Sequence, residues 1–520
     1  MIGFLSRIRV LTRASLSFAG LAGLLLVSCE GTTPSADDPV ARRHLLLVLD
    51  GLRPDYVTPY LMPALHALGQ QGLLMTRHHA VYPTVTRVNA SSLVTGSYPA
   101  THGLLGNSVF FAALDPSRFL STGDRANLLR VEGLEPGRVL TSATLGEVLQ
   151  AAGERLLVMS AGSSGSSYLL SPTALGGSIL HYDYSRPEKL YGQAVERLGA
   201  IPEAGTPNHE RNRWIVDAFF EVGLPEVNPT VTVMWLSDPD TTAHQHGVGH
   251  PTTVEALFRL DAEIQRIYDG LAATGLLDTT NIWITSDHGF SEHTGSVDIE
   301  SILLPFAGVL EDGSPTVVAG GGAIYVRSDE ETTVPAIVRS LQAADGVGAV
   351  FTKAAAPGAS EGTVAGTLSF DLIQWNHDRS AQVLYSSDWT DRVGEYGFAG
   401  TTAQDGTAGH GSSSPYDIHN TLVAVGPDLR ETAEIGVPSG NVDFAPTILH
   451  LLGLEIPASM TGRVMYEALR GGPAVADVAV ETRELRVDNA DGSYRLGAVI
   501  SEVSGHRYLD YTTVERGSAP

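Results

Sequence analysis

The stretch HLLLVLD, residues 44–50, is the first clear strand of the sequence. It is a near-continuous apolar run that ends in an aspartate, which is typical of a central parallel strand buried on both faces. Further runs of this kind are RLLVMS (155–160), TVTVMWLSD (230–238), NIWITSD (281–287) and TLVAVG (421–426). Helical patterns that end in glycine lie among them, at 62–72, 144–153 and 253–275. This alternation predicts an α/β fold with a doubly wound, mostly parallel sheet flanked by helices.

The length of the chain allows one large domain with smaller additions. Of its 520 residues, 43% are hydrophobic, so a sizeable core can be buried. We expect the main domain to span residues 44–476. Within it, residues 295–407 mix strand-like and helix-like segments and are expected to form partly a cap or insertion. Residues 477–520 alternate polar and apolar side chains, which predicts a strand-rich tail.

The formal net charge of -25 limits the partners of the protein. An acidic surface repels polyanions, so we expect no binding of nucleic-acid polymers. A small anionic substrate remains possible, because bound metal ions can reverse the field locally.

The N-terminus is typical of a targeting segment. Arginines at positions 7, 9 and 13 precede the apolar run SLSFAGLAGLLLVSC, which is too short to span a membrane and suits the core of a signal peptide. The run ends in LVSC, which resembles a bacterial lipobox, so residues 1–29 are expected to be a signal peptide that makes Cys29 a lipidated residue. The polar residues 30–43 would then form a linker.

This segment predicts an exported lipoprotein, in the periplasm or on the outer membrane of a bacterium, that contacts the membrane through its lipid anchor only. The alternative is an ordinary secretory signal and a secreted protein. Because Cys29 is the only cysteine, the mature protein would have no disulfide and no cysteine ligand for a metal.

Aspartates and histidines gather where the predicted strands end. DPDTTAHQHG places Asp240 and His244 four residues apart, so a helical turn would put both on one face. ITSDHGF ends a strand in Asp287 and His288, which can reach one ion only if the backbone turns there. Asp50 follows the first strand, and TAGHGSS sets His410 between glycines. Each pattern is weak alone, but together they offer oxygen and nitrogen ligands for a hydrolytic zinc site or a similar divalent pair.

The motifs also follow one another in a familiar order. In order along the chain, these motifs are LDGLRPD, YPTVTRVN, LVTGSYPATHGLLGN, DPDTTAHQHG, SDHGF, AGHG and TLVAVGPDLR. Together they resemble the motifs of the alkaline phosphatase superfamily, above all those of its nucleotide pyrophosphatase/phosphodiesterase branch. The resemblance extends from about residue 45 to 463. It implies an alkaline phosphatase-like fold and a metal-dependent hydrolase that acts on a small phosphate ester.

The resemblance also implies a ligand set. One divalent ion, most simply Zn²⁺, would be held by Asp240, His244 and His410. A second would be held by Asp50, Asp287, His288 and the oxygen of the nucleophile, which the pattern T-x-x-N places at Thr86. Metal ions lower the pKa of a hydroxyl, so Thr86 would attack phosphorus and form a phospho-threonine intermediate.

Asn107 and Arg87 bear on the substrate. By resemblance, Asn107 binds a phosphoryl oxygen, and a neutral side chain there favours the single charge of a phosphodiester or nucleotide pyrophosphate. Arg87 stands where many members of the family have an aromatic residue. It either binds an anionic group of the substrate or forms a salt bridge that shapes its loop.

Alternative functions follow from Arg87. A phosphomonoesterase or a phosphonate hydrolase of the phosphonoacetate type would use the same site. A non-catalytic surface binding protein is the alternative outside the enzymes. A sulfatase is excluded, because TVTRVN does not fit the C/S-x-P-x-R pattern of that class. Of the remaining histidines, His78 and His79 are expected to support the nucleophile loop or to pack in the interior.

Overall fold

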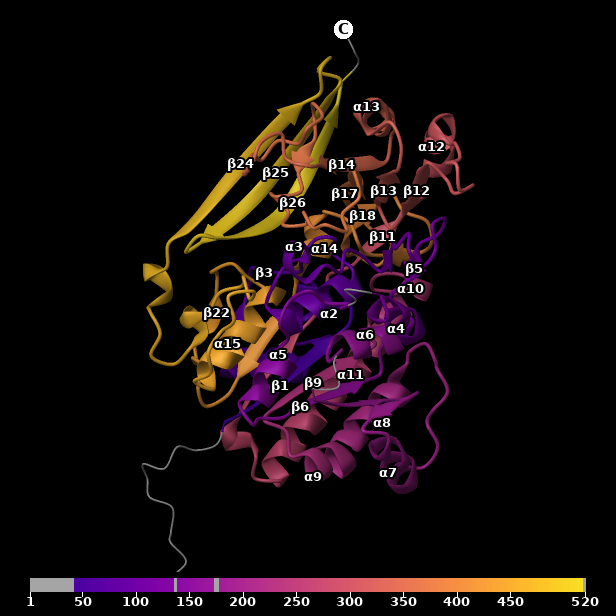
Figure 1. Ribbon diagram of the computed structural model, residues 1–520. Helices are drawn as coiled ribbons and strands as arrows, with labels where there is room; N and C mark the ends of the chain where they lie inside the picture. The colour runs from indigo at the N-terminus through magenta and orange to yellow at the C-terminus, as the bar shows by residue number, and fades with distance from the viewer. Residues whose placement is uncertain (1–41, 135–137, 173–176, 518–520) are drawn as a thin grey trace, which may run out of the picture. The chain divides into compact units, whose positions relative to one another are not determined.

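A nine-stranded sheet forms the centre of the protein. The computed structural model describes residues 42–134, 138–172 and 177–517. The predicted signal peptide, Cys29 and the predicted linker up to residue 41 lie outside the described residues. The strands run in the order β22-β2-β21-β10-β1-β9-β6-β7-β8 (Figure 1). Their bounds are β1 Arg43–Leu49, β2 Leu73–Met75, β6 Leu156–Ser160, β7 Ser178–His181, β8 Ser185–Arg186, β9 Val231–Leu236, β10 Thr280–Thr285, β21 Leu422–Val425 and β22 Ala433–Ile435.

Most of this sheet is parallel, as expected. β1 pairs in parallel with β9 and β10, and β6 pairs in parallel with β9 and β7. The run at 421–426 forms β21, but β21 is antiparallel to β10 rather than a further central parallel strand. An apolar run reports burial on both faces and carries no information on strand direction, which explains the difference.

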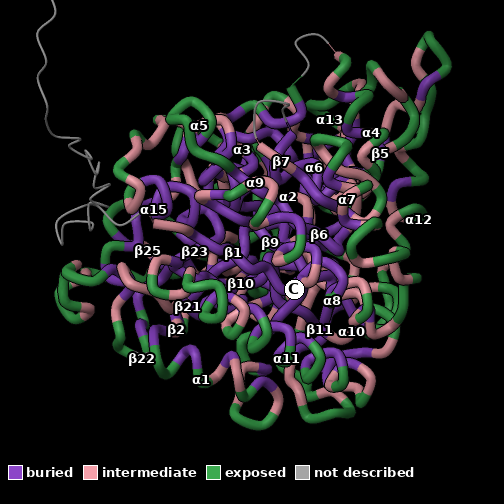
Figure 2. Tube along the Cα trace, turned by 90° about the horizontal axis from the view of Figure 1, so that it is seen from below, coloured by how far each residue is buried: buried purple, intermediate pink, exposed green. Residues whose placement is uncertain are grey.

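Helices cover both faces of the sheet. Alternate residues of β1 point to opposite sides, so Leu45, Leu47 and Leu49 join one core and Leu46 and Val48 join the other. On the first face lie α1 (Pro63–Gln71), α8 (His209–Ala218) and α11 (Pro251–Ala273), and on the second α2 (Thr86–Thr95), α5 (Leu145–Ala151) and α15 (Phe444–Leu451). Figure 2 shows the central strands buried between these layers. The doubly wound α/β prediction is therefore confirmed.

The segment predicted as a partial cap holds a second sheet in the order β12-β13-β16-β14-β15. Its elements include β12 (Val317–Gly320), β13 (Ala323–Val326), α13 (Glu330–Ala343), β14 (Val347–Thr352), β15 (Leu368–Ser369) and β16 (Val383–Ser387). The strand-like stretch 363–375 contributes only the two residues of β15, because turns follow it.

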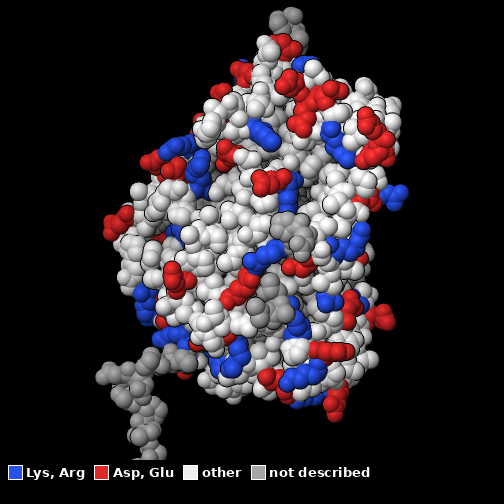
Figure 3. Space-filling model, viewed as in Figure 1, with Lys and Arg blue, Asp and Glu red and all other residues white. Residues whose placement is uncertain are grey.

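The C-terminal tail forms a three-stranded antiparallel sheet of long strands, drawn in yellow in Figure 1. They are β24 (Val480–Asp488), β25 (Tyr494–Val503) and β26 (His506–Arg516). Among residues 42–134, 138–172 and 177–517, no helix has both the length and the apolar character of a membrane span. On the face drawn in Figure 3, acidic and basic side chains are interspersed.

Candidate functional site

The site lies at the carboxyl ends of three adjacent parallel strands, β9, β1 and β10. Asp50 directly follows β1, Asp287 lies two residues beyond β10, and Asp240 begins α10 (Asp240–His246) after β9. In α/β sheets, this edge gathers ligand-binding loops. Gly51, with φ of +73°, allows the turn after β1 to approach α10 so closely that an added Cβ would lie 3.1 Å from the Cβ of Asp240.

The first cluster contains Asp50, Asp287 and His288, whose ligand atoms lie within 4.8 Å of one another. Nε2 of His288 is 3.0 Å from Oδ2 of Asp287 and 3.6 Å from Oδ1 of Asp50. All three side chains are buried. Asp287 and His288 reach one point because both lie in the loop after β10. At Gly289, the next residue, a side chain would clash with the carbonyl oxygen of Tyr416.

The second cluster contains Asp240, His244 and His410, again within 4.8 Å of one another. Oδ1 of Asp240 lies 3.2 Å from Nε2 of His244 and 3.4 Å from Nε2 of His410. The side chain of His244 is 42% exposed, so this cluster faces solvent whereas the first does not. The rings of His288 and His410 stack with centroids 3.5 Å apart, which brings the two clusters into contact.

Backbone carbonyls fix the orientation of all three histidines. Nδ1 of His244 donates to the carbonyl of Ala408, Nδ1 of His288 to that of Gly289, and Nδ1 of His410 to that of Thr84, at 2.8–2.9 Å. A carbonyl only accepts, so Nδ1 carries a proton and Nε2 is the nitrogen that faces the carboxylates. This is the usual arrangement of a histidine that binds a metal.

The carboxylates of the two clusters lack the partners that buried charges need. Among the described residues, Oδ1 of Asp50, Oδ1 of Asp240 and Oδ2 of Asp287 are buried and accept no hydrogen bond. Burial and the carboxylates of Asp287 and Asp240 raise the pKa of Asp50 well above its usual value. Buried, unpaired carboxylates are costly unless a cation joins them. The donor set therefore fits two divalent cations.

Thr86 lies beside the first cluster. It is the first residue of α2, and its hydroxyl oxygen is 3.3 Å from Nε2 of His288. Thr84 is directed elsewhere, since its hydroxyl donates to the carbonyl of Ser412. Asn89 braces the loop before the helix through hydrogen bonds to the backbone of Val81 and Val85. Of the two threonines, only Thr86 has its oxygen next to a cluster.

Asn107 and Arg87 lie on the other side of Thr86. Oδ1 of Asn107 accepts the backbone N–H of Arg87 at 3.0 Å, so the NH₂ of the amide is its remaining donor. Nε of Arg87 is buried with no hydrogen-bond partner among the described residues, and no described carboxylate lies within 4.0 Å of its guanidinium. Burial lowers the pKa of Arg87, and the carboxylates of Asp50, Asp240 and Asp287 oppose that effect. No salt bridge therefore holds Arg87 in this loop.

Two cavities border the clusters. One, of about 440 Å³, is lined by Asn107 and His410 and by Tyr385 and Gln404 of the segment 295–407. The other, of about 300 Å³, is lined by Thr86 and Arg87 and by several polar residues that sequence reasoning assigned no role, namely Ser163, Ser166, Tyr182, Asn208 and Arg211. Ser163 and Ser166 belong to the serine-rich segment SAGSSGSSYLL, residues 160–170.

Trp235 is a further residue of the site that the sequence did not reveal. It belongs to β9 and donates its indole N–H to Oδ2 of Asp50 at 2.9 Å. This bond leaves Oδ1 of Asp50 directed at the cluster. In the sequence Trp235 is one apolar residue of a buried strand, so nothing indicated that its indole N–H would donate a hydrogen bond to Asp50.

Comparison with known proteins places this chain in a family. The family model described as "Type I phosphodiesterase / nucleotide pyrophosphatase" matches residues 44–390. The chain belongs to the type I phosphodiesterase/nucleotide pyrophosphatase family. The predicted relationship is thus confirmed.

Curated relatives match parts of the chain. Ectonucleotide pyrophosphatase/phosphodiesterase family member 1 of Mus musculus is 28% identical over 277 residues, which cover 51% of this chain and 26% of the relative. The chain therefore spans about a quarter of the length of that relative. Bis(5'-adenosyl)-triphosphatase enpp4 of Mus musculus is 24% identical over 433 residues, 82% of this chain and 80% of that protein.

Solved structures show the same fold. Murine ectonucleotide pyrophosphatase/phosphodiesterase 5 has a TM-score of 0.59 at 16% identity, covering 82% of this chain and 100% of that one. A mutant of alkaline phosphatase PafA has a TM-score of 0.64 at 16% identity, covering 83% and 100%. At this identity the likeness concerns the fold alone, and it confirms an alkaline phosphatase-like architecture.

Proposed function

We propose that this member of the family is a metal-dependent hydrolase that cleaves phosphodiester or pyrophosphate bonds of small substrates, with Thr86 as nucleophile. The observation that carries the proposal is the pair of three-residue clusters with unpartnered carboxylate oxygens, which lie beside the hydroxyl of Thr86. A non-catalytic binding protein would have no need of this combination.

Two divalent ions fit the clusters, one between Asp50, Asp287 and His288 and one between Asp240, His244 and His410. Carboxylate and imidazole ligands without sulfur favour zinc, although other divalent ions accept the same donors. Bound there, the ions would supply positive charge that acidifies a hydroxyl and stabilises the oxygens of the phosphoryl group.

Thr86 would form the bond to phosphorus. Its oxygen attacks the phosphoryl group from one side while the bond to the leaving oxygen breaks on the other, giving a phospho-threonine. The carbonyl of Gly289 orients the ring of His288, and Nε2 of that ring lies 3.3 Å from the Thr86 oxygen, so both atoms lie beside the first cluster. Water then displaces the Thr86 oxygen and releases the phosphate product, which restores the hydroxyl.

Asn107 would hold an oxygen of the phosphoryl group. Its carbonyl is occupied by the N–H of Arg87, which fixes the amide plane at the start of α2 and leaves the NH₂ as donor toward the cavity. A neutral donor suffices for a diester, whose phosphoryl group carries a single negative charge.

Two separate cavities beside the clusters suit a substrate that carries two groups on phosphorus. The names of relatives are consistent with a nucleotide-containing substrate of this kind. One relative, which matches 82% of the chain, is named a bis(5'-adenosyl)-triphosphatase, and a threonine-to-alanine variant of murine family member 5, described as inactive, was solved in complex with AMP.

Arg87 favours a second negative charge on the substrate. Its guanidinium borders the smaller cavity and has no salt-bridge partner among the described residues, so an incoming anionic group would be its partner. A pyrophosphate offers such a charge beside the scissile bond. A phosphate monoester or a phosphonate with a carboxylate offers a second negative charge too. Arg87 therefore also supports the alternative function, a phosphomonoesterase or phosphonate hydrolase.

The test is one zinc-loaded preparation assayed on bis-aryl phosphate, an aryl nucleotide ester, a dinucleoside triphosphate, aryl monophosphate and phosphonoacetate. The proposal expects the highest kcat/KM among the diester and pyrophosphate substrates. Highest activity on aryl monophosphate or phosphonoacetate would replace it with the second function, and no turnover of any substrate by metal-loaded protein would favour a binding protein.

The N-terminal segment leads to a proposal on location. The relatives include ectoenzymes and venom phosphodiesterases by name, so export of this chain is consistent with them. We propose export with lipidation at Cys29. Expression in a bacterium with labelled palmitate should label the wild type and leave Cys29→Ser unlabelled; equal labelling of both would contradict the anchor.

A further inference from the structure

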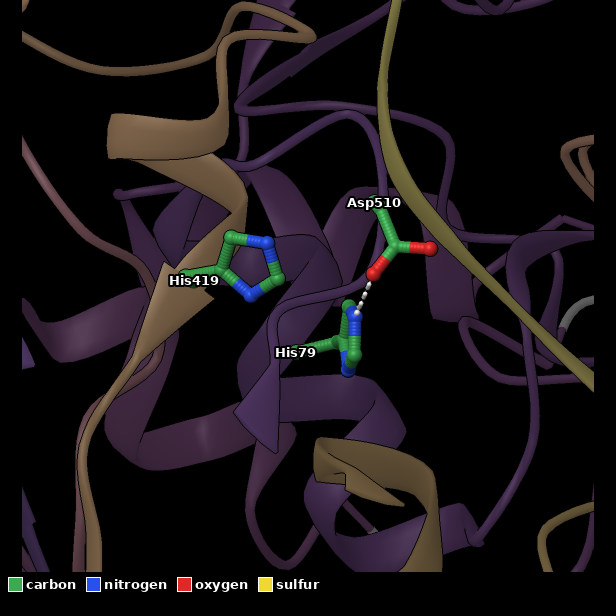
Figure 4. Close-up of side chains that lie close together, drawn as sticks. All are labelled: His79, His419 and Asp510. Atoms are coloured by element: carbon green, nitrogen blue, oxygen red, sulfur yellow. Dashed lines mark hydrogen bonds and ion pairs between the residues drawn. The ribbon is translucent and has the colours of Figure 1, made fainter. Parts of the chain in front are cut away.

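A third group of potential metal ligands lies outside the site already described. It consists of His79, His419 and Asp510, whose ligand atoms lie within 4.8 Å of one another. They come from β3 (His78–His79), β20 (His419–Asn420) and β26. His79 and His419 are directly opposed across the antiparallel pair of β3 and β20, and Figure 4 shows both rings beside the carboxylate of Asp510.

His79 is oriented in the same manner as the three histidines of the main clusters. Its Nδ1 lies 2.8 Å from the carbonyl of Ser439, and its Nε2 lies 3.1 Å from Oδ1 of Asp510. Within the described part of the chain, only His79, His244, His288 and His410 combine a carbonyl partner on Nδ1 with a carboxylate near Nε2.

The spacing suits a tetrahedral ion. Ligand atoms that are 2.0–2.1 Å from zinc lie about 3.3 Å from one another when the angles are tetrahedral. The distance between Nε2 of His79 and Oδ1 of Asp510 is 3.1 Å, and the corresponding distances in the two main clusters are 3.0–3.6 Å. Three protein ligands leave a fourth position for water.

The surroundings hold these ligands in place. Oδ2 of Asp510 accepts the hydroxyl of Ser501 at 2.6 Å, and the ring of His79 stacks on Tyr508 with centroids 5.3 Å apart. His419 lies opposite His79 across the pair of β3 and β20, and one of its ring nitrogens lies within 4.8 Å of the other two ligand atoms. Arg77 lies 3.3 Å from Oδ1 of Asp510 and offsets part of its charge, so this group should bind an ion less tightly than the main clusters.

We propose that His79, His419 and Asp510 bind a third divalent cation of the zinc class, which joins the C-terminal sheet to the strand that leads into the nucleophile loop. The competing arrangement is a protonated His79 paired directly with Asp510. It satisfies both nitrogens of His79, but it gives no role to the ring nitrogen of His419, which belongs to the same cluster.

β3 ends at His79, and the chain reaches Thr86 seven residues later. β26 comes from the far end of the sequence, so an ion here would close a loop of several hundred residues. Such a link restricts the unfolded chain more than a local one does. The proposed role is therefore structural and is separate from catalysis at the two main clusters.

The test is crystallography of the full mature chain grown with zinc, with anomalous data collected on both sides of the zinc edge. The proposal expects an anomalous peak among His79, His419 and Asp510. A map that has no peak there at saturating zinc overturns it and leaves the ion pair. Peaks at the two main clusters are scored separately, so failure of the proposed function and failure of this inference are distinguishable.

Metal content gives a second readout. Mass spectrometry of dialysed protein should find three zinc equivalents per chain in the wild type and two in His419→Ala. His450→Ala, which removes an exposed histidine at the end of α15, is the matched control and should retain three. Equal zinc content in the wild type and His419→Ala would contradict the site, and the wild-type map decides the question if the variant does not fold.

Discussion

Replacing Arg87 by methionine tests the assignment of substrate charge. Methionine keeps most of the apolar stem and removes the guanidinium, which has no carboxylate partner within 4.0 Å among the described residues. If an anionic group of the substrate is the missing partner, the variant loses a hydrogen bond to a charged group, worth about 1.5–3 kcal/mol. Because 1.4 kcal/mol corresponds to a factor of ten, kcat/KM should fall about 10–150-fold.

The loss should depend on the substrate. A dinucleoside triphosphate, with charge beside the scissile bond, should show the full effect, whereas a bis-aryl phosphate should change less than about threefold. The assay is initial-rate kinetics on both substrates with zinc-saturated protein. Arg213→Met, on an exposed position of α8, is the matched control and should alter neither rate.

Stability provides the second half of this test. Breaking a buried salt bridge costs about 3–5 kcal/mol, so a structural Arg87 would show that loss in urea unfolding of the variant. With no protein partner in place, we expect a change in the free energy of unfolding below about 1 kcal/mol. A large loss of stability with equal rate losses on both substrates would refute the reasoning and make Arg87 a loop-shaping residue.

Further predictions concern the rest of the site. Asn107→Ala should lower kcat about 10²–10³-fold on diesters, measured by steady-state kinetics; an unchanged kcat would make Asn107 a turn residue. Trp235→Phe removes the bond to Asp50 and should weaken zinc binding about 10–100-fold in competition titrations with a chelator, and equal affinity would speak against it. Gly51→Ala strains a backbone at φ of +73° and crowds Asp240, so metal affinity should fall. Dialysis against chelator should abolish turnover and zinc should restore it, while activity that survives dialysis to metal-free protein would contradict the two-metal proposal.

The strands and the candidate ligands could be predicted because both are local signals. An apolar run such as residues 44–50 reports a buried strand, and an aspartate at its end reports a loop at the edge of the sheet. The direction of β21 could not be predicted, since antiparallel and parallel strands buried on both faces have the same composition. The stretch 363–375 was predicted as strand-like, but the chain turns after Ser369.

Contacts between distant segments were the other limit. Trp235 looked like a core residue, and its bond to Asp50 exists only because β9 lies beside β1. His79 was expected to support the nucleophile loop or to pack, and its partner Asp510 is more than four hundred residues away. Neither the spacing nor the composition of the sequence indicates that such residues are in contact, so these contacts are identified only in the folded structure.

Thr86 as the attacking group is the central claim, and trapping its phosphate tests it most directly. Zinc-loaded protein is mixed with a dinucleoside triphosphate, quenched in acid within the first turnovers and digested for peptide mass spectrometry. We predict a phosphoryl or nucleotidyl group on Thr86, absent from Thr86→Ala, whose turnover should also be lost. Label on Thr84, or full turnover by Thr86→Ala, would contradict the account.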